Sequence, residues 1–156
     1  MLLLLLLLLG TVVSVTPLKW KNCNEDELFN VTKVDLSPYP VEAGKQAIIT
    51  STGTQNEVVT NGTWYAYISK YGFKVQQMKG EVCGLSPTCP CPCADKVVTT
   101  VLKIPVTPTA FTTRYSGKFT SVDQNGNSLS CVMFEFDLVN NFFTDKASEL
   151  KNKLGL

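Results

Sequence analysis

Apolar and polar residues alternate with a period of two along most of the chain after Cys23. In the segment 111–121, polar residues separate Phe111, Thr113, Tyr115, Gly117 and Phe119. This period places every second side chain on the same face, which predicts an antiparallel strand with one buried and one solvated face. The segment 129–139 alternates in the same way, and an Asn-Gly pair between the two suits a tight turn. Together they are predicted to form a long hairpin.

Earlier segments alternate similarly and are separated by proline- and glycine-containing turns. They are 30–36, 46–52, 63–71 and 97–104, with a further short stretch at 58–60. Gly72 interrupts the run 63–71, which resumes at 73–75 and leads towards Cys83. Ser37-Pro38-Tyr39-Pro40 and Pro105-Val106-Thr107-Pro108 end two of them. About seven strands with turn signals between them predict an all-β, immunoglobulin-like sandwich of antiparallel strands.

The last residues, 144–156, show a different pattern. Thr144-Asp145 can cap a short helix, and the apolar residues around it are spaced by four, three and four. We interpret this segment as a tail, helical or turn-like, that docks on the sandwich or frays in solvent. An amphipathic helix that touches a membrane is the alternative.

The first residues form an apolar run, Leu2–Leu9, followed by small residues up to Ser14. This pattern is typical of a secretory signal peptide, and it predicts cleavage after residue 14. A membrane-spanning helix needs about 20 apolar residues, and polar residues interrupt this run before that length. Residues 15–143 then form one domain, long enough to enclose a single core.

Charge and composition exclude several classes of function. The chain has 14 basic and 13 acidic residues, a net charge of +1, and no basic stripe that would indicate a nucleic-acid partner. It has no histidine and no recognisable catalytic pair of carboxylates. We therefore expect no enzymatic activity, no cofactor and no bound metal.

Two glycosylation sequons, at Asn30 and Asn61, agree with passage through the secretory pathway. That pathway is oxidising, so cysteines are expected to pair. We predict a protein that is secreted or that resides in the lumen of a lysosome or vacuole.

Four of the six cysteines, Cys83, Cys89, Cys91 and Cys93, lie within one short stretch. A four-thiolate zinc site is the alternative to disulfides, but the spacing lacks the paired C-x-x-C of zinc ribbons. Disulfides are favoured by the compartment. The isolated Cys23 and Cys131 would pair across a long loop, and Cys83 with Cys89 would close a small one. A bridge between Cys91 and Cys93 is strained, so a rearranged pairing among these four stays open.

Several motifs occur in order along the chain: "VDLSPYPVEAGK", "YGFKV" leading to "VCGLSPTCP", "KIPVTPTAF" and "LSCVMFEFDL". In this combination the chain resembles the ML lipid-recognition family, secreted sandwiches that include the Niemann–Pick sterol carrier, mite group-two allergens and phosphatidylglycerol/phosphatidylinositol transfer proteins. It departs from that pattern at Pro38-Tyr39-Pro40, where the sterol carrier has a further disulfide, at the added Cys91-Pro92-Cys93, and at Thr109-Ala110, where the plant proteins have Pro-Gly.

The resemblance implies a monomeric carrier that holds one sterol or phospholipid between two sheets and transiently contacts membranes or a membrane lipid transporter. Hydrocarbon supplies most of the affinity, because each buried CH₂ contributes about 0.8 kcal/mol. The expected cavity lining is Trp64, Phe73, Val75, Val106, Ala110, Phe111, Tyr115, Phe119, Phe134 and Phe136. Of these, Val75, Val106 and the Ala110-Phe111 pair correspond to the family's pocket mouth.

A different class of function fits the same pattern. An adhesion or receptor-type sandwich would use its exterior, and the same residues would then fill a solid core. Periodicity shows which side chains share a face, and it does not show whether two sheets meet or leave a space.

Overall fold

The structure is a computed structural model that describes residues 17–24, 27–141, Lys146 and Lys153. The predicted signal peptide lies outside these residues, as does the predicted tail apart from the two lysines. No helix in the described part is both long and apolar enough to cross a membrane. The elements in chain order are β1 (Lys19–Asn22), β2 (Phe29–Ser37), β3 (Val41–Glu42), β4 (Gln46–Gln55), β5 (Gly62–Lys70), β6 (Phe73–Glu81), η1 (Val82–Gly84), β7 (Val97–Pro105), β8 (Thr113–Asp123) and β9 (Ser128–Val139).

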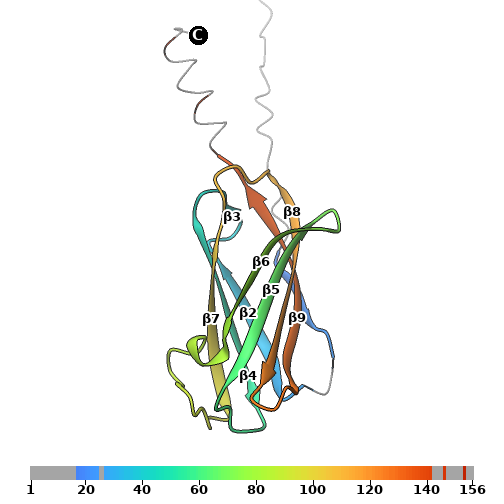
Figure 1. Ribbon diagram of the computed structural model, residues 1–156. Helices are drawn as coiled ribbons and strands as arrows, with labels where there is room; N and C mark the ends of the chain where they lie inside the picture. The colour runs from blue at the N-terminus through green and yellow to red at the C-terminus, as the bar shows by residue number, and fades with distance from the viewer. Residues whose placement is uncertain (1–16, 25–26, 142–145, 147–152, 154–156) are drawn as a thin grey trace, which may run out of the picture.

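Two sheets of unequal size pack face to face (Figure 1). The larger has the order β1-β9-β8-β5-β6, and β3 adds two residues in parallel to the end of β9. The smaller is the antiparallel sheet β2-β4-β7. This arrangement confirms the predicted immunoglobulin-like sandwich, and the inward-facing residues of both sheets form one core.

The β8–β9 hairpin forms as the sequence predicts, and its turn is held by one carboxylate. Asp123 Oδ1 accepts hydrogen bonds from the backbone N–H groups of Asn125 (2.8 Å) and Asn127 (2.7 Å). Gly126 has a φ of 81°, a conformation in which glycine avoids the clash of a Cβ atom. The turn therefore fixes the register in which β8 and β9 pair along almost their whole length.

Two segments differ from the expectation. The run 63–71 and its continuation are two antiparallel strands, β5 and β6, because Tyr71 (φ 51°) and Gly72 (φ 80°) make a two-residue turn that reverses the chain. The stretch 58–60 forms only a single bridge, between Val59 and Cys93. In addition, the unpredicted strand β1 pairs with the edge of β9.

Glu27 is a buried carboxylate, with 6% of its surface exposed. It accepts hydrogen bonds from the Cys131 N–H and, at 3.4 Å, from the Asn24 side chain. Burial raises the pKa of Glu27 above its ordinary value, and the two hydrogen bonds only partly offset this. The folded protein thus binds this proton more tightly than the unfolded chain does.

Glu27→Gln is therefore expected to change how stability depends on pH. The stabilising effect of the raised pKa is fully present below the ordinary value of about 4.5 and is lost as pH rises through the folded value. Glutamine keeps an acceptor for Cys131 and carries no charge. The Tm of the variant relative to the parent should rise as pH increases from 4.5. A constant difference in Tm across this range would contradict the expectation.

Candidate functional site

A cavity of about 60 Å³ lies between the sheets, close to the end that carries the cysteine-rich loop. The small sheet contributes Phe29, Val31, Val34, Ile49, Ser51, Gln55, Val98, Thr100 and Leu102. The large sheet contributes Phe119, Ser121, Leu129, Ser130, Val132 and Phe134. The end is closed by Val59, Val82, Cys83, Leu85, Ser86, Cys89, Cys91 and Cys93. The wall is thus shared by both sheets and one loop.

None of the lining residues is charged, and several polar side chains of the wall form hydrogen bonds. The hydroxyls of Ser121 and Ser130 lie 2.7 Å apart. The side-chain amide of Gln55 donates to the Cys93 carbonyl at 2.9 Å. An uncharged wall with few polar side chains, several of them already hydrogen-bonded, offers an apolar guest a surface with little desolvation cost.

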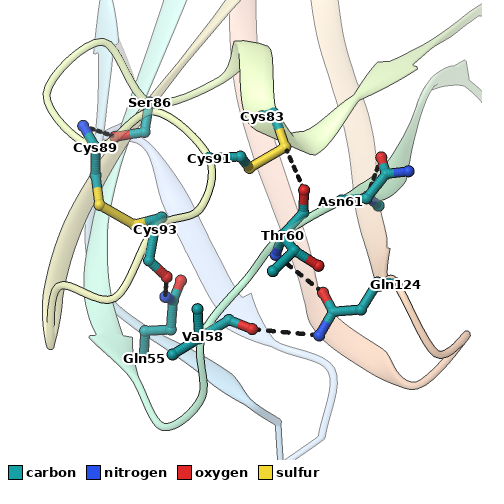
Figure 2. Close-up of a disulfide and its surroundings, with 11 residues drawn as sticks. Gln55, Val58, Thr60, Asn61, Cys83, Ser86, Cys89, Cys91, Cys93 and Gln124 are labelled. Atoms are coloured by element: carbon teal, nitrogen blue, oxygen red, sulfur yellow. Dashed lines mark hydrogen bonds between the residues drawn. A yellow bond between two sulfur atoms is a disulfide. The ribbon is translucent and has the colours of Figure 1, made fainter.

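Two crossed disulfides form the end wall (Figure 2). Cys83 pairs with Cys91, and Cys89 pairs with Cys93, so the rearranged pairing occurs in place of Cys83–Cys89. Cys93 also exchanges two backbone hydrogen bonds with Val59, of 2.8 and 3.0 Å. The loop is thereby fixed against the segment between β4 and β5. A third disulfide joins Cys23 to Cys131.

Two of the expected lining residues, Phe119 and Phe134, lie on the cavity wall. Trp64 stacks on Phe119, with ring centroids 6.0 Å apart. Tyr115 and Phe136 are buried further along the same core, where Phe136 stacks on both Tyr115 (5.8 Å) and Phe134 (6.0 Å). A ladder of aromatic rings therefore continues from the cavity into the middle of the sandwich.

The remaining expected residues lie towards the opposite end of the sandwich. Val106 and Ala110 are half-buried and pack against the core. Phe73, Val75 and Phe111 are 77%, 55% and 68% exposed. None of these five is part of the cavity wall described above.

Most of the wall was not among the expected residues. The small-sheet positions Val31, Ile49 and Leu102 fall on the inward faces of strands that the period of two does predict. That signal could have identified them. The contribution of the cysteine loop had no such signal, because its position depends on the disulfide pairing.

At the seam between the edge strands β6 and β7, one hydrogen bond joins the two strands and a second joins β7 to the cysteine loop. Gln76 donates from its side chain to the Pro105 carbonyl at 3.1 Å, and the Val101 N–H donates to the Leu85 carbonyl at 2.7 Å. From Gln76 onwards along β6, half-buried residues alternate with exposed ones, and no residue of the strand is fully buried. Because β6 and β7 are not paired as neighbouring strands, this seam is a place where the two sheets can separate.

Comparisons with known proteins agree with this architecture. Two relatives from Dictyostelium discoideum are each named as an inferred phosphatidylglycerol/phosphatidylinositol transfer protein, numbers 3 and 2. Protein 3 is 27% identical over 85% of this chain and 88% of its own length. Protein 2 is 28% identical over 82% of this chain and 90% of its own length.

Two solved structures share the fold. A Niemann-Pick type C2 protein from the Japanese carpenter ant has a TM-score of 0.63 at 13% identity, covering 78% of this chain and 99% of that one. Chicken MD-1, in a complex with lipid IVa, has a TM-score of 0.52 at 13% identity, covering 76% and 86%. The ML-domain family model matches residues 17–138. The chain therefore belongs to the ML-domain family.

Proposed function

We propose that this protein binds one lipid between its two sheets and transfers it between membranes. The observation that carries the proposal is the uncharged cavity that both sheets and the cysteine loop enclose. The names of the two Dictyostelium relatives support a phospholipid cargo, and the resemblance of the sequence motifs to a family that includes a sterol carrier supports a sterol as the second candidate. The three disulfides support a secreted or lumenal location.

The size of the cavity implies that the sheets move apart when a lipid enters. Ligand pockets in proteins typically occupy roughly 300–1,000 Å³, whereas this one has about 60 Å³. The seam between β6 and β7 is the expected line of separation, because these strands are unpaired edges of different sheets and a side-chain hydrogen bond, Gln76–Pro105, joins them. The hydrocarbon would then extend from the cavity along Phe119 and Phe134.

The small volume of the cavity also favours the alternative function, an adhesion-type sandwich with a filled core. A space of about 60 Å³ is what a nearly solid core contains, and such a core needs no guest. The two functions differ in whether the isolated protein carries lipid.

The test uses the protein expressed through a eukaryotic secretory pathway and purified from the medium. We expect mass spectrometry after denaturation to find about one lipid per chain, and we expect the delipidated protein to take up a fluorescent phospholipid or sterol. Competition among lipid classes would then identify the preferred cargo. Absence of both co-purified lipid and uptake would favour the adhesion module.

Phe119→Asp is expected to abolish lipid uptake or folding. The substitution places a carboxylate on the apolar wall beneath the Trp64 ring, where no partner for a charge lines the cavity. Phe119→Leu is the matched control, since it keeps an apolar side chain and should retain folding and most of the uptake. Unchanged stability and uptake in the aspartate variant would show that this position does not face the lipid.

A further inference from the structure

Four large apolar side chains are exposed together at the end of the sandwich opposite the cysteine loop. Tyr71, Phe73 and Val75 belong to the β5–β6 hairpin, and Phe111 belongs to the loop between β7 and β8 (Figure 1). Their exposed fractions are 78%, 77%, 55% and 68%. We call this set the aromatic tip. Grouped exposure of this kind marks an interaction site, whereas single exposed apolar residues do not.

Specific contacts hold the hairpin and the loop next to each other. The Lys70 ammonium lies 4.2 Å from the centroid of the Phe111 ring and 5.2 Å from that of Tyr71. The Tyr71 hydroxyl lies 3.3 Å from the Thr113 hydroxyl, at the start of β8. The aromatic tip is therefore one surface built from two segments that are about forty residues apart in the sequence.

Positive charge accompanies the aromatic tip. Lys74, on the same hairpin as Lys70, places its ammonium 4.0 Å from the centroid of the Tyr67 ring. The segments 65–78 and 105–116, which carry the tip, contain no aspartate or glutamate. The remaining cation of these segments, Arg114, is paired with Asp137 at 3.0 Å. Nearby carboxylates of other elements are paired with cations, Asp137 and Glu135 with Arg114 and Glu42 with Lys45. Exposed aromatic rings with lysines beside them match the interface of an anionic bilayer.

The opposite end of the sandwich has different chemistry. Asn61 lies at the start of β5 and Tyr71 follows its end, so the strand separates them by about 30 Å. Asn30 pairs with Thr54, near the end of β4 that leads to Asn61. Both sequon asparagines are exposed. Glycans at these positions would therefore lie away from the aromatic tip and leave it free to approach a surface.

From these observations we infer that the aromatic tip is the surface with which the protein docks on membranes that contain anionic phospholipid. The rings of Phe73 and Phe111 enter the interface between headgroups and acyl chains, and Lys70 and Lys74 contact the phosphates. The inference deepens the proposed transfer function by naming the face that meets the donor and acceptor membranes.

The experiment measures binding of the full mature protein to vesicles by co-flotation. We expect it to bind vesicles of phosphatidylcholine with phosphatidylglycerol, and to bind pure phosphatidylcholine vesicles at least about tenfold more weakly. The double variant Phe73→Ser/Phe111→Ser should lose about tenfold or more in affinity for the anionic vesicles, because two rings no longer leave water. Lys70→Gln/Lys74→Gln should lose a similar factor, and high salt should remove the difference from the parent.

Matched controls come from the other end of β7. Val97→Ser removes a valine that is 63% exposed beside the cysteine loop, and Lys96→Gln removes an exposed lysine there. Each should change vesicle binding by less than about twofold, since neither lies on the aromatic tip. Equal binding by the parent and both double variants would overturn the inference. So would a tip-dependent self-association of the protein that disappears in the double variants, without any vesicle binding.

Uptake of a fluorescent lipid from solution, without vesicles, separates this inference from the proposed function. The Lys70→Gln/Lys74→Gln variant should keep the parent's uptake, because neither lysine lines the cavity. A parent that binds anionic vesicles through the tip but takes up no lipid would leave the docking surface standing and overturn the carrier. A parent that takes up lipid and ignores vesicles would overturn the docking surface alone.

Discussion

Val132→Phe is expected to reduce lipid uptake by more than about tenfold while leaving the protein folded. Val132 is buried on β9, lines the cavity and pairs with Phe119 on β8. A phenyl ring at this position occupies the space that we assign to the lipid, and each CH₂ that the lipid no longer buries removes about 0.8 kcal/mol. Overpacking costs about 1–3 kcal/mol, which a domain of this size tolerates.

The matched control is Met133→Phe. Met133 is the next residue on the same strand, so its side chain points to the outer face of the large sheet. It gains a ring without changing the cavity, and uptake should match that of the parent. Uptake would be followed by fluorescence of a bound lipid probe, and folding by the Tm. A folded Val132→Phe protein with undiminished uptake would place the lipid elsewhere.

Removal of the Cys23–Cys131 disulfide is expected to be the most destabilising change. This bond links residues 108 apart and ties the first strand to the last. In the chain-entropy model, a loop of that length corresponds to about 4–5 kcal/mol, a large share of the 5–15 kcal/mol by which domains are usually stable. The Cys23→Ala/Cys131→Ala variant should therefore unfold at a much lower denaturant concentration, or fail to fold.

The comparison is with Cys89→Ala/Cys93→Ala, whose disulfide spans a sequence separation of only 4. The same model gives about 2 kcal/mol for so short a loop. Guanidinium unfolding of both double variants measures the difference. A smaller loss for the long loop than for the short one would contradict the entropic explanation.

The sandwich could be predicted because its strands repeat a local signal. Apolar residues occupy every second position over 115–119 in β8 and over 132–138 in β9, and the Asn-Gly turn fixes the hairpin between them. The strand β1 could not be predicted in this way. Its four residues are too few for a period, and it forms because β9 offers it a free edge.

The candidate site was less predictable than the fold. Phe73 and Val75 looked like residues of an inward face, yet β6 lies at the edge of the large sheet, where the three-stranded partner sheet does not cover them. Periodicity identifies residues that share a face, and it carries no information about how far the opposite sheet extends. For a related reason, the sequence could not show which end of the sandwich holds the cavity. It depends on how Cys83, Cys89 and their neighbours pair, and four cysteines allow three pairings.

The crossed bridges of the cysteine loop have a consequence for resistance to proteases. Every peptide bond between Cys83 and Cys93 lies inside at least one covalent ring, because the ring closed by Cys83–Cys91 overlaps the ring closed by Cys89–Cys93. A single cut anywhere in this stretch would leave the two new ends joined through a disulfide of the loop itself, beside the cavity wall. A cut in the loops between β4 and β5 or between β7 and β8 would leave the two pieces joined only through the distant Cys23–Cys131 bond.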